Sequence, residues 1–480
     1  MRPYTLRRSR RNSGSERDMF RGKSVLLIGL GVLGTEMLRE LETSGADVRS
    51  ILDDRYEDLP DSGRHRGPIS DLPEVLDSAR WDIIVVAAAL ISASTLNWIT
   101  KHARRSNVPI YVLPERSSFD PSEVDHPDLS QLIRRPGITD LFARTSLRVD
   151  SQEIVDSVAG RRVLITGAGG SIGSEVTRQV LRHGADVVGL LDRDDCLLHD
   201  LAVELTGQMH DPRIPLLHAD VQHAQQVDRV VQTFGPDVVI HTAALKHVTT
   251  LETDPTNALL VNVRGTANVL RAARAADVSK FVNVSTDKAA SRVGVLGISK
   301  YIGERLTQGV EMASYRSVRF GNVIGSRGSV LHTFRIQALH HEHVLVRGRE
   351  TSRFFMTAGE AASLVLSTLG QHQPGGTYVF DMGEPVQILQ LANAIVDDLV
   401  SSATIQLEEL RTGEAEHERL FHEHEQPVPT AVAGVQRVEP APLTLAEFDG
   451  ILPWNEDLSG LIPTRAHALL EDLLHHPSTT

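Results

Sequence analysis

The sequence predicts an α/β protein built from two doubly wound parallel sheets in tandem. Two short apolar segments, which start at Ser24 and Arg162, each run into a glycine-rich turn and then into a helical pattern. Further on, WDIIVVAAAL at 81–90 and PDVVIHTAAL at 236–245 repeat one plan, an apolar strand followed by Ala-Ala-Leu. Strands that alternate with helices at this spacing indicate parallel sheets with helices on both faces.

The first unit is expected at 24–118, after a basic tail at 1–23. The first 24 residues carry eight Lys and Arg against two acidic residues, which is typical of a solvated arm. Residues 119–158 contain scattered Pro, Asp and Ser and are expected to form a connector. The apolar patterns of the first unit predict strands at 24–28, 47–52, 82–86 and 109–113 and helices at 35–44 and 94–105.

The second unit, at 159–425, follows the same plan more strongly. Beyond Asn322 the less regular sequence predicts a small substrate-binding cap over the carboxyl edge of the sheet, and 426–480 are expected to be a C-terminal extension. Apolar periodicity predicts strands at 162–166, 187–191, 214–218, 237–241 and 280–285 and helices at 171–183, 358–369 and 388–399.

Composition argues against several classes of protein. The 49 basic and 62 acidic residues give a net charge of −13, and only 4% of residues are aromatic, so nucleic acid is not an expected partner. Cys196 is the single cysteine and no cleavable leader is visible, which predicts a reducing, cytoplasmic location. The longest apolar stretches, 25–33 and 83–91, fall short of the ~20 residues that span a bilayer, so no membrane span is expected.

The second glycine turn, Gly167-x-x-Gly170-x-x-Gly173, is typical of a dinucleotide site. Glycines let backbone amides approach a pyrophosphate, whose charge then lies at the positive end of a helix. Asp192 ends the next strand and is placed to bind the adenosine ribose, while Arg193 beside it leaves both NAD and NADP open. The other cofactor contacts that we expect are Ser171, Ile172, Asp220, Val221, Ala243 and Ala244.

The first turn, Gly29-x-Gly31-x-x-Gly34 with Asp53 after the next strand, has the dinucleotide spacing too. No residues downstream of it have a catalytic pattern. Two interpretations stay open here: a bound nucleotide or similar anion, and a scaffold or regulatory unit that keeps the turn for close packing of strand and helix.

The segment NVSTDKAASRVGVLGISKYIGERL at 283–306 places the trio Thr286-Asp287-Lys288 at a strand end, before a helix that carries Lys300. Here the chain resembles extended short-chain dehydrogenases, specifically the UDP-N-acetylglucosamine 4,6-dehydratases, over roughly residues 20–425. Larger members of that family place four membrane helices before a Rossmann-like first domain, and this sequence has the domain without the helices. Seven blocks in the family's order carry the resemblance: TGAGGSIGSE (166–175), HTAALKHV (241–248), VSTDKA (284–289), VRFGNVIGSRGSV (318–330), SRFFM (352–356), FDMGEPV (380–386) and LRTGEAE (410–416).

The resemblance implies a lyase that removes water from a UDP-sugar, and it also implies a homo-oligomer. Tightly bound NAD or NADP would take a hydride from C4 of the sugar, water would leave across C5–C6, and the hydride would return to C6. In this scheme Asp287 is the acid at C6, Lys288 is the base near C5, and Lys300 holds the nicotinamide ribose. Lys288 can act as a base only if its pKa falls from ~10.4 toward neutrality.

The chain departs from most short-chain dehydrogenases at Leu296, where they have a tyrosine that takes the C4 hydroxyl proton. The long dehydratases resemble this chain in often having Met there. The resemblance to these dehydratases implies that Thr286, with Ser285 as a second candidate beside it, replaces the phenol and relays the proton to Asp287 or Lys300. Tyr301 is one residue out of register and should point about 100° away on a helix.

The substrate contacts that we expect lie on loops and on the cap. Arginine forks match phosphate oxygens, so arginines there are candidates for the diphosphate of the substrate. Arg411 and Glu414 match a family block that contacts the nucleotide, although Thr412 and Ala415 replace its Pro and Lys. The full set is Lys246, His247, Arg319, Asn322, Arg327, Arg353, Arg411 and Glu414.

Two alternatives to a dehydratase stay open. One is a nucleotide-sugar 4-epimerase or reductase on the same scaffold, and the other is a catalytically silent protein that binds NAD(P) or a nucleotide sugar. A metal site is not expected, because HHEH at 340–343 and HEH at 422–424 lack the spacing of zinc ligands. A serine hydrolase is not expected either, since no G-x-S-x-G elbow lies in a strand–turn–helix context.

Overall fold

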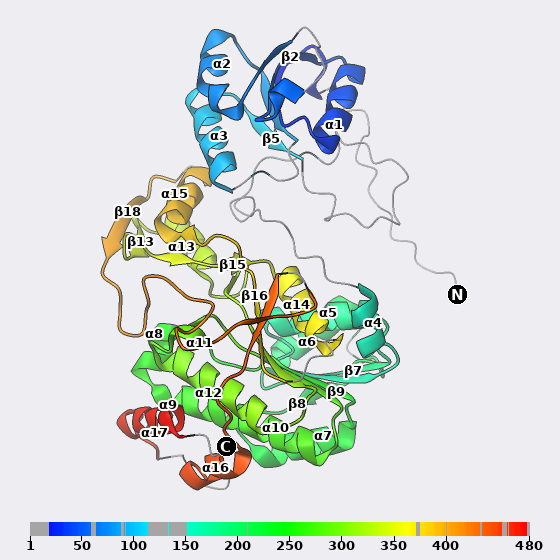
Figure 1. Ribbon diagram of the computed structural model, residues 1–480, viewed down its shortest axis with the longest axis vertical. Helices are drawn as coiled ribbons and strands as arrows, with labels where there is room; N and C mark the ends of the chain where they lie inside the picture. The colour runs from blue at the N-terminus through cyan, green and yellow to red at the C-terminus, as the bar shows by residue number, and fades with distance from the viewer. Residues whose placement is uncertain are drawn as a thin grey trace. The chain divides into compact units, whose positions relative to one another are not determined.

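The computed structural model describes residues 19–58, 64–87, 91, 93–113, 133, 151–208, 210–370, 375–399, 401–432, 434–453, 458 and 460–477 (Figure 1). The chain divides into two compact units, Met1–Ser146 and Leu147–Thr480. This division falls within the expected connector. Residues 1–18 of the basic tail and most of the connector lie outside the described residues.

The first unit contains a parallel sheet with the strand order β3-β2-β1-β4-β5. Side chains of β1 alternate between two apolar clusters, since Leu26 and Ile28 pack on one side and Val25 and Leu27 on the other. Both faces of the sheet are therefore buried, as in a doubly wound unit. Its elements are β1 (Ser24–Ile28), α1 (Val32–Thr43), β2 (Asp47–Leu52), β3 (His65–Gly67), α2 (Leu72–Ser78), β4 (Ile83–Val86), α3 (Ala93–Arg105) and β5 (Ile110–Val112), with the 3₁₀ turns η2 (Tyr56–Asp58) and η3 (Ile69–Asp71).

The main sheet of the second unit has the strand order β19-β20-β16-β11-β10-β9-β6-β7-β8 over the described residues. It is parallel from β16 to β8 and becomes antiparallel at β20 and β19. Its strands are β6 (Arg162–Thr166), β7 (Val187–Asp192), β8 (Leu216–His218), β9 (Val238–His241), β10 (Lys280–Val284), β11 (Tyr315–Arg319), β16 (Thr377–Phe380), β19 (Val428–Pro429) and β20 (Val435–Val438).

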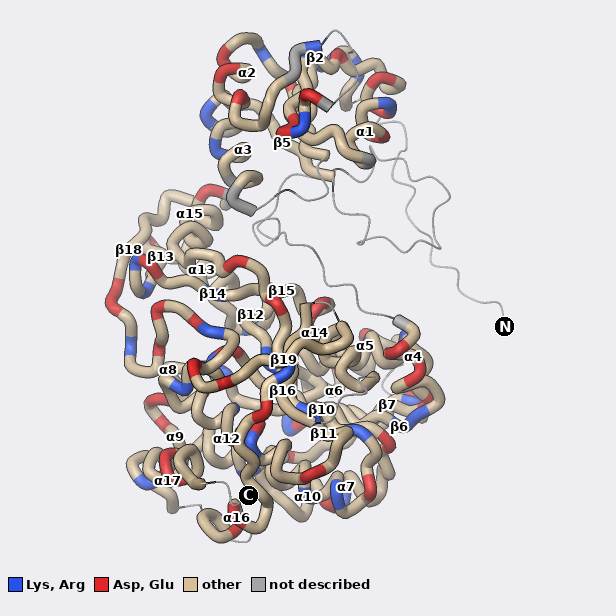
Figure 2. The backbone as a smooth tube through the Cα atoms, in the orientation of Figure 1, with Lys and Arg blue, Asp and Glu red and all other residues tan. Residues whose placement is uncertain are grey.

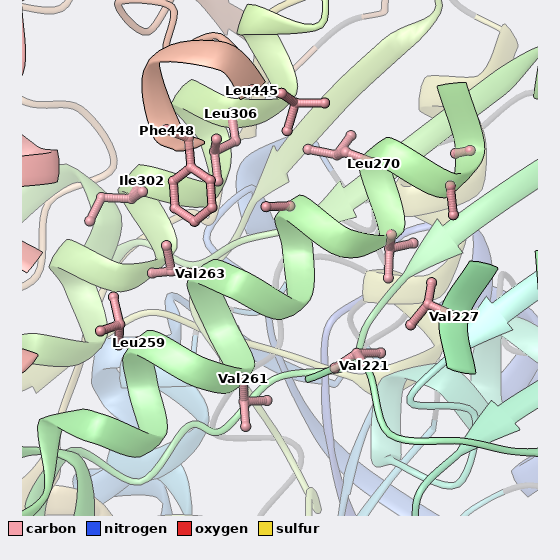
Figure 3. Close-up of a cluster of buried hydrophobic side chains, with 14 of the residues drawn as sticks. Val221, Val227, Leu259, Val261, Val263, Leu270, Ile302, Leu306, Leu445 and Phe448 are labelled. Carbon is pink, nitrogen blue, oxygen red and sulfur yellow. The ribbon is translucent and has the colours of Figure 1, made fainter. Parts of the chain in front are cut away.

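Helices cover both faces of this sheet. Leu164 and Val239 face one apolar cluster, part of which is drawn in Figure 3, and Val163 and Ile165 face another. The helices are α4 (Ser151–Val158), α5 (Ser171–Arg182), α6 (Asp195–Thr206), α7 (Ala224–Phe234), α8 (Val248–Thr253), α9 (Pro255–Asn257), the π-helix η7 (Ala258–Arg264), α10 (Gly265–Ala275), α11 (Lys288–Ser291), α12 (Val295–Gly309), α14 (Ala358–Ser367) with η8 (Thr368–Gly370), α16 (Leu445–Ile451) and α17 (Pro463–His475).

The expected cap consists of short strand pairs and two helices. Its strands pair as β12 with β15, β13 with β18 and β14 with β17. Residues 426–480 supply two strands to the main sheet, and α17 packs on α9 and α12. The bounds in the cap are β12 (Asn322–Val323), α13 (Val330–His340), β13 (His343–Arg347), β14 (Ser352–Arg353), β15 (Phe355–Met356), β17 (Val386–Gln387), α15 (Ile388–Asp398) and β18 (Thr404–Glu408).

The parallel sheet of the first unit and the mainly parallel sheet of the second, which has two antiparallel strands at one edge, confirm the predicted α/β fold class. Acidic and basic residues both occur throughout each unit (Figure 2). Within the described ranges, no helix has the combination of length and apolar character that crossing a membrane requires.

Candidate active site

The glycine turn after β6 is tight because its glycines leave no room for side chains. Gly167 has φ +69°, and a Cβ there would lie 2.7 Å from the backbone N and Cα of Ala243. A Cβ on Gly173 would collide with the carbonyl oxygen of Gly167. The turn therefore presents bare backbone at the N-terminus of α5, the arrangement that a pyrophosphate needs.

Asp192 ends β7 and holds this turn. Its Oδ2 accepts a hydrogen bond from Gly169 N at 3.0 Å, and its Oδ1 accepts one from Asp194 N at 3.1 Å. Arg193 is exposed, with Nη1 3.9 Å from Asp220 Oδ2. Val221 is buried, and its carbonyl accepts a hydrogen bond from the Asn268 side chain at 2.9 Å.

A cavity of about 520 Å³ lies at the carboxyl edge of the sheet, beside the glycine turn. Its wall gathers residues from the glycine turn, from the strand ends, from α12 and from the cap. Expected residues that line it are Gly170, Ser171, Ile172, Gly173, Ala244, Lys246, His247, Thr286, Lys288, Lys300, Asn322 and Arg327. Expected residues outside this lining are Gly167, Asp192, Arg193, Asp220, Val221, Ala243, Asp287, Arg319, Arg353, Arg411 and Glu414.

The Thr-Asp-Lys trio follows β10, and its members contact one another. Asp287 is fully buried, and its Oδ1 accepts hydrogen bonds from Thr286 Oγ1 at 2.9 Å and from Lys288 Nζ at 3.1 Å. Asp287 Oδ2 has no hydrogen-bond partner among the described residues and lies close to Gly321, where a Cβ would be 3.1 Å away. Asp287 therefore stands directly behind two side chains that reach the cavity.

Lys288 is surrounded by acceptors. Its Nζ donates to Asn322 Oδ1 at 3.3 Å and lies 3.4 Å from Glu418 Oε1. Burial lowers the pKa of Lys288, but the carboxylates of Asp287 and Glu418 outweigh burial, so the net pKa is raised. A lysine that acts as a base needs a lowered pKa, so the direction at Lys288 is opposite to the one we expected.

Helix α12 brings Leu296 and Lys300 to the cavity one turn apart. Burial lowers the pKa of Lys300 to about 8, against an opposing effect of Glu304. Tyr301 is buried beneath the Arg292 guanidinium, whose Cζ is 3.6 Å from the ring centroid, and it does not line the cavity. The one-residue shift of this tyrosine thus removes it from the cavity, as predicted.

The loop after β12 reaches across to the glycine turn. Arg327 N donates to Ser171 Oγ at 3.2 Å, and Arg327 Nη1 donates to Gly169 O at 3.4 Å. Lys246 Nζ donates to Ser326 Oγ at 3.2 Å, and burial lowers its pKa. Residues of this loop, Ser326 and Arg327, therefore form part of the cavity wall.

Three of the expected arginines do not line the cavity, and two of them pair inside the protein. Arg319 is fully buried between Glu304 and Glu425, so it has no access to substrate, contrary to our expectation. Arg353 donates to the carbonyls of Ser352, Ala415 and Glu416 and thereby holds the loop that carries Glu418. Arg411 is exposed, and its backbone N donates to Glu414 Oε2 at 3.0 Å.

Sequence reasoning missed two buried acids near the trio. Glu304 accepts a hydrogen bond from Ser285 Oγ at 2.6 Å, and Glu418 approaches Lys288. Glu304 lies one helical turn after Lys300, which is a signal that helix periodicity could have given. Glu418 follows an irregular loop, where no periodic pattern marks a buried side chain.

Residues 163–440 match the family described as "Polysaccharide biosynthesis protein". The chain is also 33% identical to the capsular polysaccharide biosynthesis protein CapD of Staphylococcus aureus over 419 residues, which is 84% of this chain and 69% of CapD. The chain belongs to the polysaccharide biosynthesis protein family. This membership confirms the resemblance on which the site assignments depend.

A further relative of the chain is named for its action on a nucleotide sugar. The UDP-glucose 4-epimerase of Rickettsia canadensis is 32% identical over 274 residues, covering 54% of this chain and 77% of the epimerase. Among solved structures, Pen from Bacillus thuringiensis is similar with a TM-score of 0.53 and 28% identity, over 61% of this chain and 98% of Pen. The chain is therefore similar in fold to Pen over 61% of its length.

Proposed function

We propose that this protein is an NAD(P)-dependent nucleotide-sugar 4,6-dehydratase that acts on a UDP-N-acetylhexosamine of the UDP-N-acetylglucosamine type. The observation that carries the proposal is that Thr286, Lys288 and Lys300 line one and the same cavity beside the glycine turn. Asp287 accepts a hydrogen bond from Thr286 and another from Lys288. Membership of the polysaccharide biosynthesis family and the likeness to a UDP-glucose 4-epimerase support a nucleotide sugar as the substrate.

The residues around the glycine turn fit a nicotinamide dinucleotide. A Cβ at Gly167 or at Gly173 would collide with neighbouring backbone, so only glycines permit the tight turn that leads into the N-terminus of α5, where a pyrophosphate would bind. In this proposal Gly170 to Gly173 would hold the pyrophosphate, Asp192 the adenosine ribose and Lys300 the nicotinamide ribose. When bound, such a dinucleotide supplies the reversible hydride chemistry that the reaction needs.

The hydrogen bond from Thr286 to Asp287 favours one of the two expected relay paths. In the proposed path, the C4 hydroxyl of the sugar gives its proton to Thr286 Oγ1 while Thr286 passes its own proton to the Asp287 carboxylate, 2.9 Å away. Among the described residues, Thr286 makes no hydrogen bond to Lys300 that would support the other path. Leu296, at the usual place of the tyrosine, has no proton to exchange.

The same relay prepares an acid and a base for the loss of water. Once protonated, Asp287 has a proton for the departing C6 hydroxyl group. Its protonation also removes the strongest of the charges that raise the pKa of Lys288, so this pKa falls toward the range of a base. The raised pKa of Lys288 in the resting pair is therefore compatible with a role as the base at C5.

Incubation of the purified protein with UDP-N-acetylglucosamine, followed by mass spectrometry, tests the proposal. We expect the sugar nucleotide to lose about 18 Da, the mass of one water, without an added reductant, because the hydride returns to the product. The variant Asp287→Asn should be slower by roughly 100-fold or more. The control Asp472→Asn, an exposed acid on α17, should keep the wild-type rate.

The alternatives predict other products. An unchanged mass with an inverted C4 centre would identify a 4-epimerase. Tight binding of the nucleotide sugar without conversion would identify a silent binding protein. Either result would overturn the dehydratase proposal.

A further inference from the structure

Glu418 is a buried carboxylate that the mechanism above leaves without a role. Its side chain is 3% exposed, and Oε1 lies 3.4 Å from Lys288 Nζ and 3.6 Å from Arg353 Nε. Its Oε2 is buried without a hydrogen-bond partner among the described residues. Burying a carboxylate oxygen without a donor costs stability, so its presence here needs an explanation.

Lys288 must lose a proton before it can act as a base, and few nearby groups can accept one. The charged groups that face it are Asp287 at the start of α11, Arg353 on β14 and Glu418, while Asn322 on β12 accepts its hydrogen bond. In the proposed relay Asp287 receives the proton of the C4 hydroxyl. Arginine has no acceptor, and an amide oxygen is a very weak base, so Glu418 is the remaining acceptor.

We propose that Glu418 takes the proton of Lys288 and so frees this lysine to act as the base, an inference that rests on the dehydratase function proposed above. One N–H bond of Lys288 Nζ breaks and one O–H bond forms on Glu418 Oε1. The ion pair becomes a neutral amine and a carboxylic acid, with no change of oxidation state and no co-reactant. Glu418 acts through Lys288 and is a positioning residue.

A second, small cavity supports this role. It is lined by Lys288 and Glu418 together with Gly413 and Ala415, and its volume is about 10 Å³. A cavity of this size holds roughly one water molecule. A water there would donate to the unpaired carboxylate oxygen. When Lys288 gives the proton that it took from C5 back to the sugar, the proton on Glu418 returns to Lys288, so the pair regains its starting charges after each turnover.

The test compares Glu418→Gln and Glu418→Asp with the control Glu416→Gln, an exposed glutamate on the same loop, in the full chain with NAD and UDP-N-acetylglucosamine. Gln keeps the shape of the side chain and removes the acceptor, whereas Asp keeps an acceptor. At pH 7 we expect kcat of Glu418→Gln to fall at least ~10-fold with KM changed less than about threefold, and Glu418→Asp to recover part of the loss. The kcat of Glu418→Gln should then rise with pH, because Lys288 loses its proton to solvent before the sugar binds. The wild type and Glu416→Gln should show no such rise.

Competitive labelling of amines with acetic anhydride, followed by peptide mass spectrometry, measures the pH at which Lys288 loses its proton in the absence of any sugar. Because the Glu418 carboxylate raises the pKa of Lys288, the labelling midpoint of Glu418→Gln should move to lower pH, while Glu416→Gln leaves it unchanged. An unmoved midpoint, or a loss of kcat that is equal at every pH, would overturn the role of Glu418. If the midpoint moves but the wild type dehydrates no sugar, the coupling of Glu418 to Lys288 is supported and the dehydratase function is the part that fails.

Discussion

Lys288 shows how burial and charge oppose each other at a single residue. Water is largely excluded from its ammonium group, which disfavours the charge, yet two carboxylates stabilise it. Buried charges of this kind are costly to keep unless they are paired. The proton of Lys288 is therefore controlled by Asp287 and Glu418, and each change in their charge changes the basicity of the lysine.

The hydroxyl group of Thr286 provides the first prediction. Thr286→Val keeps the shape of the side chain but cannot carry a proton between the sugar and Asp287. We expect kcat for UDP-N-acetylglucosamine to fall about 100-fold or more, with little change in thermal stability. Initial rates by mass spectrometry check this, with Thr250→Val, an exposed threonine on α8, as the control. Full turnover by Thr286→Val would exclude the relay.

The buried Lys300 provides a prediction for the pH dependence of stability without cofactor. Its pKa is about 8 in the folded protein against a reference value of 10.5, so the unfolded chain binds more protons between these values. The free energy of unfolding should therefore rise with pH in this window, by about 1.5 kcal/mol from pH 8 to 9.5. This gain in stability is lost again as the pH falls back to 8, where Lys300 takes up its proton in the folded protein. Urea unfolding of the wild type and of Lys300→Met at both pH values checks this. Equal pH dependence of the two proteins would show that Lys300 is not the cause.

At the scale of elements, α12 links the cavity to the C-terminal region. Leu296, Lys300 and Glu304 follow one another at intervals of one helical turn, so they share a face of the helix. Glu304 then pairs with Arg319 on β11. The next residue of α12, Arg305, faces α17 and donates hydrogen bonds to the carbonyls of Leu473, Leu474 and His476.

Arg305 thus caps the C-terminal end of α17, whose last carbonyls have no partner within the helix. Arg305→Ala leaves these buried carbonyls without donors, and we expect the free energy of unfolding to fall by roughly 3 kcal/mol. Denaturant unfolding and amide exchange of 463–475 check this. Arg465→Ala, at an exposed position of α17, should change little.

At the scale of the whole molecule, the two units share the geometry of the glycine turn. In the first unit Asp53 Oδ2 accepts a hydrogen bond from Leu30 N at 2.7 Å, and in the second Asp192 Oδ2 accepts one from Gly169 N at 3.0 Å. The turn alone therefore does not distinguish a cofactor site from a scaffold. Among the described residues, the second unit has a cavity of about 520 Å³ with titratable residues beside its turn.

Amide exchange with and without NAD tests this difference. We expect NAD to slow exchange by at least ~10-fold in 163–173 of the second unit and to leave 24–34 of the first unit unchanged, since bound ligand suppresses local opening. Protection of both turns would assign a dinucleotide to the first unit too. Protection of neither would remove the proposed cofactor.

Much of the site was predictable because it follows regular strands. Gly170 to Gly173, Thr286, Lys288 and Lys300 all lie at strand ends or on the helices that follow, and apolar periodicity fixes those places. The arginines were harder to predict, since a sequence does not reveal that Arg319 meets Glu304 and Glu425 inside the protein. A charged residue on a loop has the same local pattern whether it faces substrate or a buried acid.

The sequence by itself determined the two parallel sheets, the glycine turn and the Thr286-Asp287-Lys288 trio, because local patterns of apolar residues and glycines specify strands, turns and their ends. The tertiary structure was needed to show which side chains reach the cavity and in which direction the pKa of Lys288 is shifted. The pKa shift of Lys288 depends in part on Glu418, which comes from a loop far along the chain, and electrostatic interactions act through space rather than along the sequence.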